Sequence, residues 1–201
     1  MTETDPSVGP FDEALKRKHW EREALANQGV ASRDPLRDEV LERLLDRLDD
    51  VKGRTFPRAL DVGFGEGAAR ALLRGRGGVT DLIECTSGNS QVLGSGKEMV
   101  KRGDTRSLES GQFDLIIANL CLHWCNDPLG EVKEWKRLLK DDGYFLCSIF
   151  AGETIRELRI ALALAEAERT GGRAQRVSPL MRLRETGILP SSEAWLFRPQ
   201  T

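Results

Sequence analysis

The stretch that most constrains the fold runs from Arg58 to Gly67 and reads RALDVGFGEG. Its short apolar run ends in three glycines at every second position, Gly63, Gly65 and Gly67. A buried strand followed by such a turn lets backbone N–H groups approach a nucleotide-like ligand, because glycine carries no Cβ atom. The stretch therefore predicts a strand, a cofactor-binding turn and a helix. A purely structural turn is the weaker alternative.

Length and composition limit the classes of protein that fit. A chain of 201 residues holds one α/β domain, and a net charge of −2 provides no long-range attraction for nucleic acid. No stretch of about 20 apolar residues is present, so we expect no transmembrane segment. We expect residues 1–10 to be disordered, residues 11–189 to form the domain and residues 190–201 to form an irregular tail.

The order of apolar runs and helical patterns predicts a βαβ architecture. Apolar runs predict strands at 59–62, 79–85, 113–124 and 144–150. Helical spacing predicts helices at 11–27, at 67–74, at 129–140, at 154–170 and from Pro35 until before Gly53. Asp34 is the expected N-cap of the helix that begins at Pro35. The predicted fold is α/β and Rossmann-like, a parallel sheet with helices on both faces.

Polar residues follow the predicted strands at the edge where a ligand binds in open parallel sheets. Glu84 ends the second strand, about 20 residues beyond the glycine turn, where a carboxylate accepts both ribose hydroxyls of a nucleoside. Asp104 precedes the next apolar run and is expected to receive an adenine amino group, with a simple turn residue as the equal alternative. Asn119 lies at the tip of the run that follows, and we include it among the cofactor-binding residues.

The acidic residue Asp61, at the end of the first strand, narrows the choice of cofactor. A carboxylate there repels a pyrophosphate and favours a cation, which suits S-adenosylmethionine with its amino group and sulfonium charge. We expect Asp61 to orient the amino-acid end of this cofactor through water or the loop backbone. Gly63, Gly65 and Gly67 would allow its close approach.

The motif Cys121-x-His123-x-Cys125 places three possible metal ligands on one face, provided that the strand extends as far as Cys125. A fourth ligand is not evident, so we predict no metal site. His123 is instead our candidate catalytic residue at the rim of the site, able to take a proton or bind a carboxylate near pH 7. A histidine that only packs or hydrogen-bonds is the alternative.

Four stretches carry a resemblance to a known family: Phe11-Asp12 with Lys16-Arg17, LDVGFGEG at 60–67, FDLIIANLCLHWCNDP at 113–128 and GETIRELRIALALAEAERTGG at 152–172. In them the chain resembles the methyltransferase-like mitochondrial complex I assembly factor 5 family, whose bacterial relatives are similar to malonyl-carrier-protein methyltransferases. The resemblance implies a class I S-adenosylmethionine-dependent methyltransferase fold and a role in the assembly of NADH:ubiquinone oxidoreductase.

The same resemblance implies a partner and a compartment. The partner would be a complex I subunit, with an arginine that is hydroxylated or methylated. The compartment would be the mitochondrial matrix, with peripheral association at the inner membrane. The N-terminus has the wrong character for a transit peptide, with Glu3 and Asp5 but no arginine before Pro10. From the residues alone we expect either a cytoplasmic protein or one whose targeting segment is missing from this sequence.

The final residues, PSSEAWLFRPQT, do not supply the terminal strand hairpin that this fold carries. We therefore expect a C-terminally truncated chain, with its last strand as an exposed edge. Two alternatives to the family function follow. One is a catalytically inactive scaffold, and the other is a methyltransferase that acts on a carrier protein or a small molecule.

Overall fold

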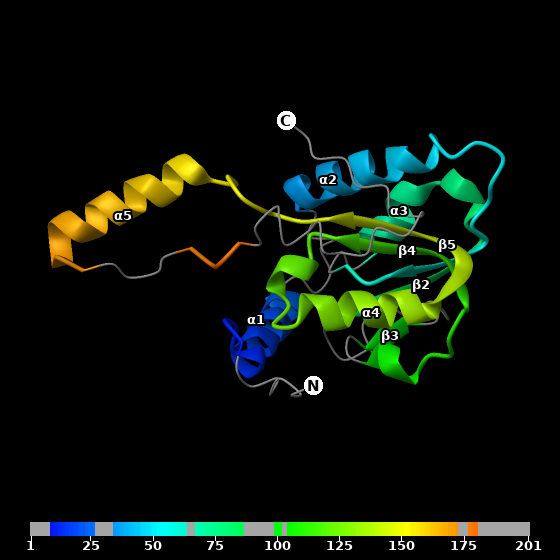
Figure 1. Cartoon of the computed structure of the whole chain (residues 1–201), viewed down its shortest axis with the longest axis horizontal. Helices are drawn as coiled ribbons and strands as arrows, with labels where there is room; N and C mark the ends of the chain where they lie inside the picture. The colour runs from blue at the N-terminus through cyan, green and yellow to red at the C-terminus, as the bar shows by residue number, and fades with distance from the viewer. Residues whose placement is uncertain are drawn as a thin grey trace. The chain divides into compact units, whose positions relative to one another are not determined.

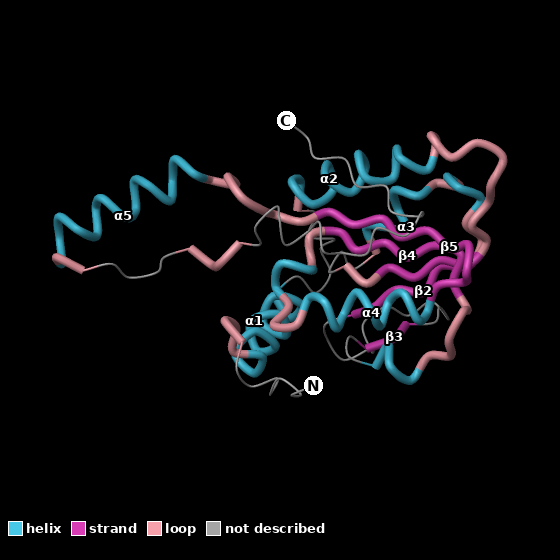
Figure 2. Tube along the Cα trace, in the orientation of Figure 1, coloured by secondary structure: helices cyan, strands magenta, loops and turns pink. Residues whose placement is uncertain are grey.

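The computed structural model describes residues 9–26, 34–63, 67–86, 99–101, 104–172 and 177–180. The strands of this part of the chain form one parallel sheet in the order β3-β2-β1-β4-β5 (Figures 1 and 2). They are β1 Arg58–Asp61, β2 Asp81–Thr86, β3 Met99–Lys101, β4 Phe113–Asn119 and β5 Leu139–Ser148. The predicted parallel α/β architecture is thereby confirmed.

Five α-helices fall in the described residues: α1 Glu13–Ala26, α2 Pro35–Leu45, α3 Ala68–Leu73, α4 Pro128–Leu138 and α5 Arg156–Thr170. Two of them begin as capping chemistry predicts. The Asp34 side chain accepts hydrogen bonds from the backbone N–H groups of Leu36 and Arg37, and Asp127 accepts one from Gly130. A proline follows each cap at the first helical position, where its missing N–H costs no hydrogen bond.

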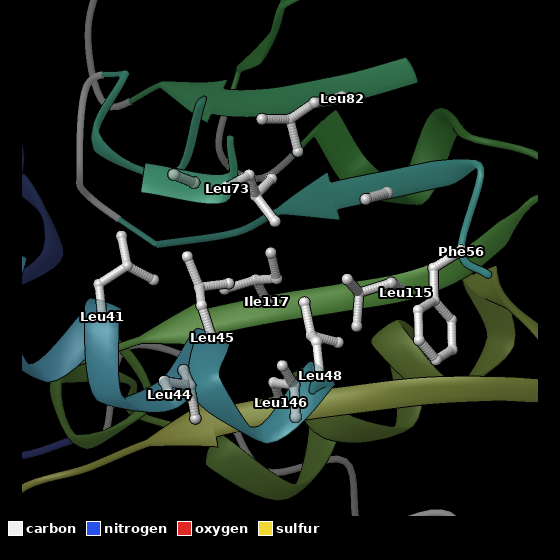
Figure 3. Packing of buried hydrophobic residues seen from close by; sticks show 12 residues of the cluster. Leu41, Leu44, Leu45, Leu48, Phe56, Leu73, Leu82, Leu115, Ile117 and Leu146 are labelled. Carbon is white, nitrogen blue, oxygen red and sulfur yellow. The ribbon is translucent and has the colours of Figure 1, made fainter. Parts of the chain in front are cut away.

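Helices α2 and α3 cover one face of the sheet, and α4 covers the other (Figure 1). Figure 3 shows the first layer, in which Leu45 of α2 and Leu73 of α3 pack toward Ile117 of β4 in one buried cluster. On the other face, the ring of Trp135 in α4 lies 5.6 Å from that of Phe145 in β5, centroid to centroid. Two packed layers bury a strand on both faces, which explains the continuous apolar run of β4.

Strand β4 ends earlier than the apolar run predicts. It stops at Asn119, because Leu120 has a left-handed backbone with φ of +47° and the chain then enters the short 3₁₀ helix η4, Leu122–Trp124. The prediction of a strand up to residue 124 is therefore wrong. The condition that would place Cys121, His123 and Cys125 on one strand face is not met.

The chain divides into two compact units. The first contains all strands of the sheet, and the second spans Phe150–Pro190 and contains α5. Gly171, in a left-handed conformation, caps the end of α5, where the sequence predicts a stop. The apolar side chains of Leu158, Ile160 and Leu164 on α5 are at least half exposed. The predicted limits of a single domain, 11 and 189, stay predictions.

None of the helices in the described ranges is both long enough and apolar enough to cross a bilayer.

Replacement of Leu45 by alanine tests the packing of α2 on the sheet. The Leu45 side chain is completely buried, so Leu45→Ala should lower the free energy of unfolding by about 3 kcal/mol through lost burial and a residual cavity. Leu36, on the same helix, is 56% exposed, and Leu36→Ala should cost about 0.5 kcal/mol or less. Urea denaturation measures both values. Equal losses for the two variants would contradict this packing.

Candidate functional site

Two acidic side chains lie next to each other at the carboxyl ends of β1 and β2. Asp61 and Glu84 are direct partners in the parallel register, so their side chains leave the sheet on the same face. Both are buried, with 4% and 7% of their surfaces exposed. Two carboxylates in such an environment repel each other and lose hydration, so the site needs compensating donors or cations.

The first compensation for Asp61 comes from the glycine turn. Its Oδ1 atom accepts a hydrogen bond of 2.8 Å from the backbone N–H of Gly63. Burial raises the pKa of Asp61 to about 7; the Gly63 hydrogen bond opposes this shift and the charge of Glu84 adds to it. Asp61 is thus partly protonated near neutral pH and becomes a full anion when a cation approaches.

The glycines of the turn are required by local geometry where the structure describes them. A Cβ atom on Gly63 would lie 2.9 Å from Asp61 Oδ1 and 3.3 Å from the backbone of Asn119. Gly67 has φ of +96°, a conformation that other residues rarely adopt. Gly65 lies outside the described residues, so its predicted cofactor contact stays a prediction.

Glu84 has an arginine partner that the sequence analysis did not identify. Arg70 of α3 donates from Nε to Glu84 Oε2 at 2.9 Å, and from Nη2 to the carbonyl oxygen of Leu82 at 2.7 Å. The position of Arg70 in the first turn after Gly67 is the only feature of the sequence that hints at this ion pair. Whether α3 and β2 form an ion pair depends on how they pack. The expected contact of the Glu84 carboxylate with the ribose hydroxyls stays a prediction, and one of its two oxygens already accepts from Arg70.

The other oxygen of that carboxylate, Glu84 Oε1, is buried and has no hydrogen-bond partner within the described ranges. A buried acceptor without a donor is costly, and native proteins rarely leave one unmet. The atom is suited to a hydroxyl donor from a ligand. At the carboxyl edge of the sheet, beside Asp61, such an acceptor fits the ribose of a nucleoside cofactor.

Asn119 lies at the tip of β4, and its side chain holds the fold together. Its Nδ2 atom donates to the carbonyl oxygen of Arg37 at 3.1 Å, and its Oδ1 atom accepts from Ser148 Oγ at 2.7 Å. These bonds join α2, β4 and β5 beside the glycine turn. Its predicted contact with a cofactor stays a prediction, and its amide is already engaged.

Asp104 begins the 3₁₀ helix η3, Asp104–Ser107. Its side chain lies outside the part of the chain that can be described, so the predicted contact with adenine stays a prediction. The neighbouring Thr105 is buried, with 5% of its surface exposed.

His123 lies in η4 and is 6% exposed. Burial, with the positive charge of Arg37 as a smaller cause, lowers the pKa of His123 to about 4. The imidazole is therefore neutral at pH 7. Its expected ability to take a proton or bind a carboxylate near that pH stays a prediction. Its catalytic role stays a prediction.

The described residues contain no group of three or more histidine, cysteine, aspartate or glutamate side chains placed to hold a metal ion. The four cysteines at positions 85, 121, 125 and 147 form no disulfide bond.

The segment at the start of α1 is fastened to the loop around η4. The Asn126 side chain accepts from the backbone N–H of Phe11 at 3.0 Å and donates to its carbonyl oxygen at 2.9 Å. Lys16 Nζ donates to the carbonyl oxygen of Trp124 at 2.7 Å, and the rings of Phe11 and Trp124 lie 5.5 Å apart. These contacts join residues more than 100 positions apart and hold η4, the turn that carries His123.

Comparison with known proteins identifies a methyltransferase domain model that matches residues 60–147. The chain is 35% identical over 187 residues to the zebrafish protein named "Arginine-hydroxylase NDUFAF5, mitochondrial", covering 89% of this chain and 57% of the relative. The human protein of that name is 35% identical over 185 residues, covering 89% and 53%. A malonyl-[acyl-carrier protein] O-methyltransferase of Xylella fastidiosa is 34% identical over 146 residues, covering 66% and 48%. The chain thus spans about half the length of these relatives.

Solved structures show the same fold. The plantazolicin methyltransferase BamL, in complex with SAH, superposes with a TM-score of 0.53 at 19% identity, covering 89% of this chain and 66% of its own. The Burkholderia thailandensis 1,6-didemethyltoxoflavin-N1-methyltransferase, with bound S-adenosylhomocysteine, gives 0.51 at 21% identity, covering 76% and 67%. The fold is therefore that of a class I methyltransferase.

Replacement of Asp61 by asparagine tests the electrostatics of the site. The pKa of Asp61 rises from its ordinary value of 3.8 to about 7 in the folded chain, so its ionisation destabilises the folded state progressively as pH rises from about 4 to 7. The difference of about 3 units corresponds to at most about 4 kcal/mol. Asp61→Asn keeps the acceptor for Gly63 and should be more stable than the wild type at pH 8.

Urea denaturation at pH 4, 6 and 8 measures this difference. The two proteins should be nearly equal at pH 4, and their stabilities should diverge as pH rises. The burial of His123 destabilises both proteins equally as pH falls from 6.5 toward 4, so it cancels in the comparison. An advantage of Asp61→Asn that does not change with pH would contradict the raised pKa.

Proposed function

Because this chain is a homologue of the NDUFAF5 arginine-hydroxylase family and carries a methyltransferase domain, we propose that it binds S-adenosylmethionine and modifies a protein side chain. The observation that carries the proposal is the unpartnered, buried Oε1 atom of Glu84, at the carboxyl edge of the sheet beside the glycine turn. A buried carboxylate oxygen that lacks a hydrogen-bond donor at this position fits a hydroxyl group of a ribose.

Different residues of the chain would bind different parts of the cofactor. Glu84 would hold the ribose, and Asp61 with the Gly63 turn would hold the cationic amino-acid end. Asp104 would receive the adenine amino group, and Asn119 would keep the tip of β4 in place next to the turn. When bound, the cofactor supplies a methyl group activated by its sulfonium charge. The chain would then align the acceptor group and exclude water from it.

The proposed substrate is an arginine of a complex I subunit, and the proposed setting is the assembly of that complex at the matrix side of the mitochondrial inner membrane. The names of the eukaryotic relatives, arginine hydroxylases of mitochondria, support this choice. Methylation moves the sulfonium methyl group of the cofactor to the acceptor atom, which loses a proton. Hydroxylation does not consume that methyl group and instead needs dioxygen together with a two-electron reductant, the second oxygen atom leaving as water. The carrier-protein methyltransferase of Xylella fastidiosa supports a second candidate, methylation of a malonyl group on a carrier protein.

Calorimetric titration with S-adenosylhomocysteine tests the cofactor site. We expect binding by the wild-type chain, and a loss of about tenfold in affinity for Glu84→Gln, because one charged acceptor is removed. Gly63→Ala should also bind more weakly, since the added Cβ would press on Asp61 and the Asn119 backbone.

The matched control for Glu84→Gln is Asp81→Asn. Asp81 is an exposed carboxylate at the start of β2, the strand that carries Glu84, and its ion pair with Arg58 is solvent-exposed. Its affinity should stay within about twofold of wild type. Absence of binding by the folded wild-type chain would overturn the cofactor proposal.

Mass spectrometry of complex I subunits, from cells with and without this chain, tests the substrate. A methyl group or an oxygen atom on an arginine, present only when the chain is present, would support the proposal and separate methylation from hydroxylation. Unchanged arginines, together with methyl ester formation on a malonyl-carrier protein by the purified chain, would instead support the second candidate.

A further inference from the structure

We propose that Arg70 is a positioning residue that fixes the carboxylate of Glu84, so that Oε1 faces the sugar hydroxyls of the ligand and selects a hydroxylated ribose. The inference rests on the proposed cofactor site and adds to it the residue that sets its sugar preference.

The guanidinium of Arg70 is held at two points on β2. One bond reaches Glu84 Oε2 and the other reaches the carbonyl oxygen of Leu82, two residues earlier on the same strand. Because the guanidinium is planar and its donors form a rigid fork, two such bonds fix its orientation. Arg70 therefore acts as a brace between α3 and β2.

The brace determines where Oε1 points. With Oε2 bound to Arg70, the carboxylate plane of Glu84 cannot rotate freely, and Oε1 stays in its buried position without a partner. The Glu84 side chain is 9% exposed and that of Arg70 is 30% exposed, so water screens this pair only weakly. The positive charge of Arg70 also offsets the repulsion between Glu84 and Asp61, its register partner on β1.

The location of Arg70 couples this brace to the glycine turn. Arg70 lies in the first turn of α3, directly after Gly67, whose left-handed backbone starts the helix. Gly67, the last glycine of the predicted cofactor turn, and Arg70, which orients Glu84, thus belong to one short segment. We infer that sugar recognition depends on Arg70 even though Arg70 need not contact the sugar.

Competition titrations separate positioning from a general structural role. Adenosine and 2′,3′-dideoxyadenosine compete with S-adenosylhomocysteine for the wild-type chain, for Arg70→Gln, for Arg70→Lys and for the exposed control Arg74→Gln. The wild type and Arg74→Gln should prefer adenosine by about tenfold, the effect of one charged hydrogen bond. Arg70→Gln should lose most of this preference by weakening adenosine alone. Arg70→Lys keeps the charge without the fork and should retain part of it.

A thermal melt of each variant confirms that it is folded, and Arg70→Lys carries the test if Arg70→Gln does not fold. An unchanged preference for adenosine in the Arg70 variants, or an equal loss of affinity for both nucleosides, would overturn the positioning role. A wild-type chain that does not bind S-adenosylhomocysteine would instead overturn the proposed function itself.

Discussion

The candidate site depends on two buried carboxylates, Asp61 and Glu84, held side by side at the ends of adjacent parallel strands. The parallel register imposes this proximity, and burial makes it costly. The chain reduces the cost differently for each group: Glu84 has the cation of Arg70, whereas Asp61 has one backbone N–H and a pKa raised to about 7. Among the described residues, Glu84 Oε1 still lacks a donor and Asp61 still lacks a cation. These two needs match the ribose and the amino-acid end of the proposed cofactor.

The fold holds this pair in place from both sides of the sheet. Leucines of α2 and α3 pack on one face and Trp135 of α4 packs on the other, so β1 and β4 cannot shift without breaking buried contacts. Asn119 then links the tip of β4 to α2 and β5, next to Gly63. The glycine is needed because a Cβ atom there would crowd Asp61 Oδ1 and the Asn119 backbone. Rigidity at this edge would keep Asp61 and Gly63 in place for the proposed cofactor.

The sequence predicts the elements of this fold better than the chemistry of its site. Apolar runs and the caps Asp34 and Asp127 are local signals, so four of the five strands and the starts of α2 and α4 could be recognised. The short strand β3 was not predicted. The end of β4 could not be recognised, because the run stays apolar past Asn119 while the left-handed backbone of Leu120 turns the chain. The Arg70–Glu84 pair and the low pKa of His123 arise only from packing between distant segments. No local sequence pattern predicts such contacts.

A crystal structure of the chain grown with S-adenosylhomocysteine is the most direct test of the proposed site. We predict a ribose hydroxyl within hydrogen-bond distance of Glu84 Oε1 and the Arg70 contact to Oε2 retained. The ligand's amino group should lie toward Asp61 and Gly63. A ligand bound elsewhere, or one whose ribose leaves Glu84 Oε1 without a donor, would contradict the proposed site.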